Sequence, residues 1–159
     1  MELAIIIFLL GGLFLGWSLG ANDAANVFGT AVGTRMIRFK TAAIVCSIFV
    51  ILGAIISGAG TTETLGRLGA INALPGAFSA CVAAGLSVYV MTKFGLPVST
   101  TQAIVGAIVG WNLYTGSPTN LKILVTILST WILCPIIAGL IAILFLSLIH
   151  ISEPTRLLS

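Results

Sequence analysis

Charged residues are scarce in this sequence of 159 residues, of which only 7% are Asp, Glu, Lys or Arg. A soluble domain carries about 25%. Hydrophobic residues make up 58% of the chain, and the mean hydropathy is +1.20. So few charges cannot cover a water-exposed globule of this length. The composition therefore excludes a soluble enzyme or DNA-binding module and places the chain in a lipid bilayer.

Groups that could catalyse a reaction or hold a transition metal are also few. The chain has one histidine and three cysteines, Cys46, Cys81 and Cys134, and each cysteine lies in an apolar stretch without CxxC spacing. This pattern favours neither a disulfide framework nor a metal knuckle, and the cysteines are best read as small buried hydrophobes. Without a nucleophile–base pair, we expect no enzyme and no cofactor apart from a coupling ion.

The net charge of +3 comes from seven basic residues that are scattered along the chain. No run of them interleaves with aromatic residues as a nucleic-acid groove would require, so we expect no nucleic-acid partner. The only cluster, Arg35, Arg38 and Lys40, lies between two apolar stretches. The positive-inside rule places this cluster in the cytoplasm. It predicts an outside N-terminus and an inside Lys93, and we expect the membrane to be the plasma membrane.

The apolar stretches predict an all-α integral membrane protein with about five segments. The first, 3–34, has about 32 residues, more than one span of about 20 and fewer than two. We expect a helix plus a half-helix there, or a helix broken near the middle of the membrane. The fourth stretch, 96–111, is short, and the sequence leaves open whether it spans or is re-entrant. The stretches are 3–34, 41–57, 73–91, 96–111 and 121–145, with a polar connection at 58–72 and a turn at 116–118.

The sequence changes character after residue 145. Residues 147–156 (SLIHISEPTR) resemble the translation of a transposase adapter used in sequencing libraries. We therefore expect a membrane domain over 1–145 and a non-native tail over 146–159. The alternative is a genuine short polar tail. His150, the single histidine, lies in this tail and receives no role.

Asp23 is the only acidic residue inside an apolar stretch. Acidic residues within a bilayer are costly and mark functional sites by default. Asn22 and Asn26 lie one helical turn apart beside it, so three oxygen-bearing side chains could converge on a hard cation such as sodium. The alternative is that the asparagines cap a helix start and Asp23 pairs with a basic loop residue. Spacing alone leaves the two open.

Three consecutive hydroxyl residues, Ser99, Thr100 and Thr101, follow Pro97. Ser99 is a natural N-cap after the proline break, and a helix that begins here would offer its N–H groups and positive dipole end to an anion. The alternative is an ordinary capped helix. Both polar segments also lead into a GxxxG ridge, at 29–33 and at 106–110, and such ridges would allow the two helices to approach closely.

Two segments carry a resemblance to a known family. Residues 20–26 (GANDAAN) with 29–34 (GTAVGT), and residues 95–106 (GLPVSTTQAIVG), resemble the two signatures of the inorganic phosphate transporter (PiT) family. Family members hold two inverted-topology repeats with broken or re-entrant helices and couple phosphate uptake to a sodium or proton gradient, and some carry sulfate. Gln102 departs from the histidine of many members and cannot titrate.

The resemblance implies one repeat of a secondary transporter that works by alternating access. Asn22, Asp23 and Asn26 would bind the cation, and Ser99, Thr100 and Thr101 would bind phosphate. We expect a truncated half of a cation-coupled, sodium-driven phosphate transporter. Its partners would be phosphate, membrane lipid and a missing second repeat or a second copy of itself. The alternatives are an oxyanion permease for sulfate, a proton-coupled phosphate carrier and an inactive membrane fragment.

Overall fold

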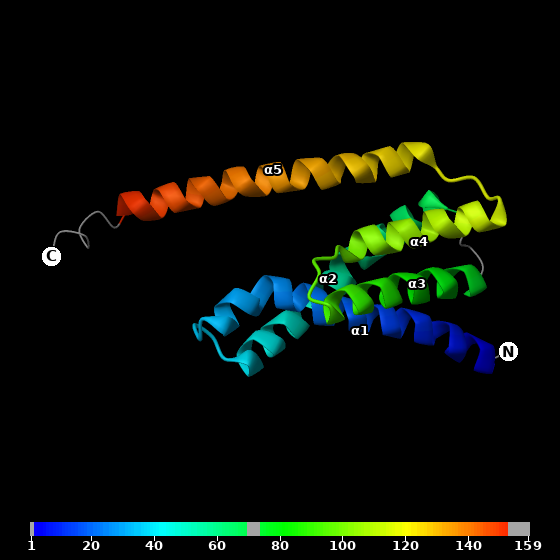
Figure 1. Cartoon of the computed structure of the whole chain (residues 1–159), viewed down its shortest axis with the longest axis horizontal. Helices are drawn as coiled ribbons and strands as arrows, with labels where there is room; N and C mark the ends of the chain where they lie inside the picture. Colours follow the sequence, from blue (N-terminus) through cyan, green and yellow to red (C-terminus); the bar gives the residue numbers. More distant parts are fainter. Residues whose placement is uncertain (1, 70–73, 153–159) are drawn as a thin grey trace. The chain divides into compact units, whose positions relative to one another are not determined.

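The computed structural model describes residues 2–69 and 74–152, which form five helices (Figure 1). Four of these helices are long and apolar enough to cross a membrane, which confirms the predicted all-helical membrane fold. The exception is α4, which at about 24 Å is shorter than the hydrocarbon core. The helices are α1 (Glu2–Gly33), α2 (Phe39–Leu68), α3 (Leu74–Lys93), α4 (Thr100–Thr115) and α5 (Leu121–Ser152).

Helix α1 is continuous through Gly20, so the predicted break in this stretch is wrong. A glycine inside a helix costs only about 1 kcal/mol relative to alanine. The neighbouring alanines, Ala21, Ala24 and Ala25, are the strongest helix formers and compensate for it. The side chains of Asn22 and Asp23 bond to each other and to other segments of the chain and therefore do not compete for the backbone of α1.

Helix α2 extends through much of the predicted polar connection and ends at Leu68. Three threonine hydroxyls in this part each donate to the carbonyl four residues earlier, so they add no unsatisfied group to the helix. Glu63 and Arg67 form an ion pair one turn apart on its exposed surface. The threonines and this charge pair are polar in composition and yet compatible with a helix. Residues 70–72 of the predicted connection lie outside the described residues.

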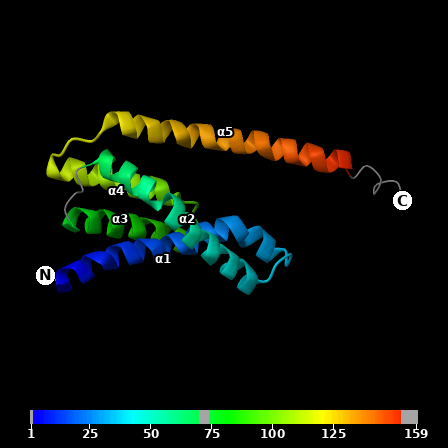
Figure 2. The same cartoon turned by 180° about the vertical axis from the view of Figure 1, so that it is seen from behind.

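Helix α3 packs against both α1 and α4. Two of its glycines permit this contact. A Cβ at Gly85 would lie 2.8 Å from the Phe14 ring of α1, and one at Gly76 would lie 2.9 Å from the Trp111 indole of α4. Helices α1 and α3 run parallel to each other, because Phe14 lies against Gly85 and, further along both helices, Asn22 bonds to Thr92 (Figure 2).

The predicted GxxxG contact between α1 and α4 is wrong. A methyl group added at Gly29, Gly33, Gly106 or Gly110 would meet no described atom within 4 Å, apart from its own helix and immediate neighbours. The glycine ridges do not face each other because α3 supplies most of the packing surface for α1 and for α4. The second half of α1 instead lines an apolar groove of about 650 Å³ with the first half of α2.

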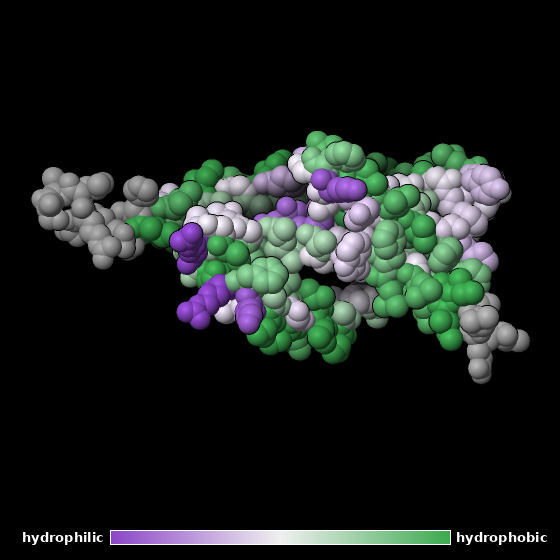
Figure 3. All heavy atoms as spheres, turned by 60° about the horizontal axis from the view of Figure 1, so that its bottom comes forward, coloured by the Kyte–Doolittle hydropathy of each residue, from purple (hydrophilic) through white to green (hydrophobic). Residues whose placement is uncertain are grey.

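A tight turn joins α1 to α2. Arg35 adopts a left-handed conformation with φ 62°, and its N–H donates to the Val32 carbonyl. Hydrophilic side chains gather at the end of the molecule that carries this turn, whereas most of the face drawn in Figure 3 is hydrophobic. The predicted basic cluster therefore sits at the outer end of a helical hairpin, consistent with a charged loop at a membrane surface.

A buried amide, that of Asn112, fastens the C-terminal end of α4 to the loop that follows it. Asn112 is fully buried and donates from Nδ2 to Thr119 Oγ1 at 2.9 Å. A Cβ at Gly69 would lie 2.4 Å from Asn112 Nδ2, so only glycine fits where the chain leaves α2. Gly116 ends α4 in the left-handed conformation, with φ 68°, as the predicted turn at 116–118 requires.

Helix α5 forms a unit of its own in the chain, separate from residues 1–120. It contains Pro135 and runs to Ser152, past the boundary predicted at residue 145. Prolines are tolerated inside transmembrane helices because local adjustments satisfy the freed carbonyl. Residues 153–159 of the predicted non-native tail lie outside the described residues.

Candidate functional site

The buried amide of Asn22 joins three segments of the chain. Asn22 is 6% exposed. Its Nδ2 donates to Asp23 Oδ1 at 2.8 Å and to the Val98 carbonyl at 3.1 Å. Its Oδ1 accepts from Thr92 Oγ1 at 3.3 Å, at the end of α3. These bonds hold α3 and the loop before α4 against α1. Because Asn22 lies in the interior of α1, it does not cap a helix start.

The carboxylate of Asp23 links the two sequence motifs directly. Thr100 Oγ1 donates to Asp23 Oδ2 at 3.0 Å across 77 residues of sequence. Thr100 is 8% exposed, and Asp23 is half-buried. Among the described residues, the hydrogen-bond donors to Asp23 are Asn22 and Thr100, and the one ion pair is Glu63–Arg67. Asp23 therefore does not form the alternative pair with a basic loop residue.

The N-terminus of α4 adds favourable electrostatics to this contact. Ser99 is the N-cap, and its hydroxyl accepts from the Gln102 N–H at 3.3 Å, which confirms the predicted cap. The positive end of the helix dipole lies at Thr100 and attracts a negative group. Asp23 thus contacts the end of α4 that the sequence assigned to an anion. The predicted cation and anion segments meet at one place.

The other predicted site residues do not join the hydrogen bonds around Asp23. Asn26 is exposed on α1, one turn after Asn22, and Thr101 is exposed in the first turn of α4. The Ser99 side chain is exposed apart from its capping bond. The described structure therefore brings together Asn22, Asp23 and Thr100. It leaves three predicted polar side chains at the surface beside them.

Sequence reasoning missed two members of this cluster, Thr92 and the carbonyl of Val98. Thr92 stands in the last turn of α3 without any local signal of a role, and a backbone carbonyl leaves no trace in a sequence. A further buried hydroxyl, Ser18 Oγ, lies one helical turn before Asn22 and has no hydrogen-bond partner among the described residues. Only the spacing of four residues to Asn22 hinted at it.

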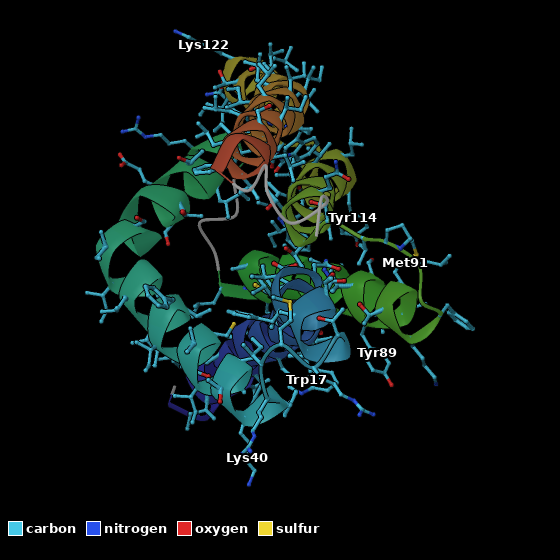
Figure 4. All side chains as sticks on the ribbon, turned by 90° about the vertical axis from the view of Figure 1, so that its left-hand side faces the viewer. Trp17, Lys40, Tyr89, Met91, Tyr114 and Lys122 are labelled. Carbon is cyan, nitrogen blue, oxygen red and sulfur yellow. The ribbon has the colours of Figure 1, made fainter. Side chains whose placement is uncertain are left out.

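The aromatic residues mark the outer edge of the α1–α3 contact. Trp17 and Tyr89 have ring centroids 5.7 Å apart, and Figure 4 shows both on the outside of the helices. Phe14 stacks on Trp17 at 6.2 Å. On α1, these rings come one to two turns before Asn22. The oxygens of Asp23, Asn22 and Thr100 are of the kind that hard cations prefer.

Comparison with known proteins identifies the family. A profile of the phosphate transporter family matches residues 19–157. The chain belongs to the phosphate transporter family. A protein named as a phosphate permease of Thermococcus kodakarensis is 37% identical over 155 residues, covering 91% of this chain and 38% of its own length. The chloroplastic inorganic phosphate transporter 2-1 of Arabidopsis thaliana is 32% identical and is matched over 25% of its length.

A solved structure has the same fold. The chain superposes on a sodium-dependent phosphate transporter with a TM-score of 0.82 and 34% identity, over 96% of this chain and 40% of that one. The chain therefore spans about two fifths of this transporter and of the Thermococcus relative. The resemblance drawn from residues 20–34 and 95–106 is confirmed, as is the fold of a single transporter repeat.

Proposed function

We propose that this chain is one half of a secondary transporter that moves inorganic phosphate across the plasma membrane with a sodium ion as the driving cation. Family membership and the likeness to a sodium-dependent phosphate transporter support this proposal. The observation that carries it is the hydrogen bond from Thr100 Oγ1 to Asp23 Oδ2. This bond couples the carboxylate that would bind a cation to the helix end that would bind an anion.

The coupling follows from charge. An uncompensated carboxylate at the N-terminus of α4 repels a phosphate that approaches the same helix end. A sodium ion bound by Asp23 and Asn22 removes that repulsion and leaves the N–H groups of α4 free to bind the anion. Each ligand therefore raises the affinity for the other, which is the reciprocity that a symporter needs. Asn26, Ser99 and Thr101 complete the two binding sets in this proposal.

The chain would act with a partner that supplies the rest of the transporter. That partner is a second repeat or a second copy of this chain, with the N-terminus of this half outside the cell and lipid around α2 and α5. We also propose that residues 146–159 are not native. Clean genomic sequence of the locus tests this: a different reading frame after residue 145 supports it, and the same residues followed by a stop codon contradict it.

The function is tested by phosphate uptake into proteoliposomes. The 159-residue chain and the full-length transporter that contains this repeat are reconstituted side by side, and labelled phosphate uptake is measured under sodium, proton or no gradient. Uptake that requires sodium supports the proposal. Uptake that follows only the proton gradient indicates a proton-coupled phosphate carrier. Uptake that excess sulfate abolishes indicates a sulfate permease. Uptake by the full-length protein alone indicates that the isolated half is inactive.

A further inference from the structure

The end of α3 lies well short of the turn that joins α1 to α2. Thr92 bonds to Asn22, and Tyr89 contacts Trp17, so the last turn of α3 is level with the middle of α1. Helix α1 continues for eleven more residues to Gly33. At 1.5 Å per residue, that is about 16 Å. Figure 1 shows the α1–α2 hairpin extending beyond the loop between α3 and α4.

Helix α2 indicates where the bilayer begins. Its first half carries large exposed apolar side chains such as Ile44, Phe49 and Ile51, each at least 59% exposed. These require lipid or another apolar partner, and they start directly after the basic turn. This half of α2 lines one groove with the second half of α1, so the two run side by side. With the basic turn at the bilayer surface, the loop between α3 and α4 lies about 16 Å deep, near the middle of a core of about 30 Å.

Lys93 is the last residue of α3 and the only charged residue between 74 and 115. Its side chain is exposed. The one ion pair among the described residues is Glu63–Arg67 on α2, so Lys93 is not part of it. The sequence had placed this lysine on the cytoplasmic surface. The contacts of α3 place it instead at the depth of Asp23, where a lysine in contact with lipid is strongly disfavoured and where charged residues face water-filled cavities.

We propose that Lys93 is the cationic residue of the anion path, and that it binds the phosphate oxyanion together with the exposed hydroxyls of Ser99 and Thr101. Lys93 ends α3, the two hydroxyl residues begin α4, and six residues, Phe94–Ser99, separate the two helices. A lysine at the depth of the site supplies the positive charge that a doubly charged anion needs after it leaves water. This inference rests on the proposed function and adds a residue to its site.

The first experiment measures phosphate uptake by the full-length transporter with Lys93→Gln, which removes the charge and keeps the length. We expect the KM for phosphate to rise about tenfold, as for loss of a charged hydrogen bond, with the sodium dependence unchanged. Lys93→Arg should restore the KM. The matched control Lys40→Gln removes a charge at the basic turn, where Figure 4 shows the side chain pointing away from the helices, and should leave the KM unchanged. An unchanged KM in Lys93→Gln overturns the proposal.

The second experiment does not depend on transport. Lys93→Cys is made with Cys46, Cys81 and Cys134 replaced by alanine, and its reaction with a membrane-impermeant, charged thiol reagent is followed in membrane vesicles. We expect labelling from the side of the basic turn and slower labelling when inorganic phosphate is present. Reaction only with a lipid-soluble reagent, as for a side chain that faces the lipid acyl chains, overturns the proposal, as does labelling that phosphate does not slow. If uptake fails in every variant but phosphate still protects the cysteine, transport by this protein is refuted and the Lys93 assignment stands.

Discussion

Asn22 in α1 and Asn112 in α4 are both buried and hydrogen-bonded, but Asn112 bonds to a nearby residue and Asn22 bonds to distant ones. Asn112 bonds to Thr119, seven residues away, and closes the loop after α4. Asn22 bonds to Thr92 and to the Val98 carbonyl, 70 and 76 residues away, and stands beside a carboxylate. A local, neutral pair is sufficient to end a helix. The network around Asp23 instead gathers three segments at a carboxylate inside a transmembrane helix, where an acidic residue is costly and marks a candidate functional site.

The largest effect should follow from Asp23→Asn, which removes the charge and keeps the size. Loss of a charged ligand is equivalent to about 1.5–3 kcal/mol, so the apparent affinity for sodium should fall roughly 10- to 150-fold. The sodium dependence of phosphate uptake by the full-length transporter measures it. Glu63→Gln, at an exposed ion pair on α2, is the matched control. If both variants keep normal sodium affinity, the Asn22 network is as structural as the Asn112 pair.

Asn112→Ala should act on stability alone. It leaves the Thr119 hydroxyl without its donor and opens space beside Gly69, so the free energy of unfolding should fall by about 1–3 kcal/mol. Thermal unfolding in detergent, together with the double variant that adds Thr119→Val, gives the coupling energy of the pair. The KM for phosphate should stay constant. A raised KM with unchanged stability would erase the contrast between the two asparagines.

Thr100→Val keeps the shape of the side chain and removes its hydrogen bond to Asp23. We expect sodium and phosphate to lose part of their mutual dependence, with the cooperativity factor between them falling up to about tenfold. Uptake measured over a matrix of sodium and phosphate concentrations yields this factor. Thr100→Ser retains the hydroxyl and should behave as the wild type. Equal cooperativity in all three proteins would disprove a coupling role for this bond.

The smallest effects concern Ser99, which is both the cap of α4 and a proposed phosphate ligand. Ser99→Ala should cost about 1 kcal/mol of stability through the lost cap. Ser99→Asp preserves the cap but places a negative charge where phosphate would bind, so it should raise the KM for phosphate without lowering the unfolding temperature. A normal KM in Ser99→Asp would leave Ser99 with the capping role only.

Local features were predictable from the sequence, because each depends on a few neighbouring residues. The Ser99 cap and the left-handed Gly116 are of this kind. Two features of the helices were not predicted: α1 continues through Gly20, and α2 continues through its threonines. The polar side chains there bond to carbonyls of their own helix or to distant residues, and composition does not reveal these partners.

The long-range part of the site was accessible only in outline. Asp23 and Thr100 were identified from their motifs, and the two glycine ridges predicted that the helices that carry these motifs approach each other. The contributions of Thr92 and Val98 depend on the register of α3 against α1. That register is set by close contacts at glycines such as Gly85. The GxxxG spacing pointed to other glycines, because it identifies small surfaces without identifying their partners.

The left-handed Arg35 combines backbone strain with a positive charge in the α1–α2 turn. A left-handed residue with a side chain costs roughly 1–2 kcal/mol more than glycine, the usual residue at this position. The chain nevertheless has arginine here, one of three positive charges within six residues. Glycine would relax the backbone but weaken the signal that orients a helical hairpin during its insertion. Arg35 thus keeps a third positive charge in the turn at the expense of backbone strain.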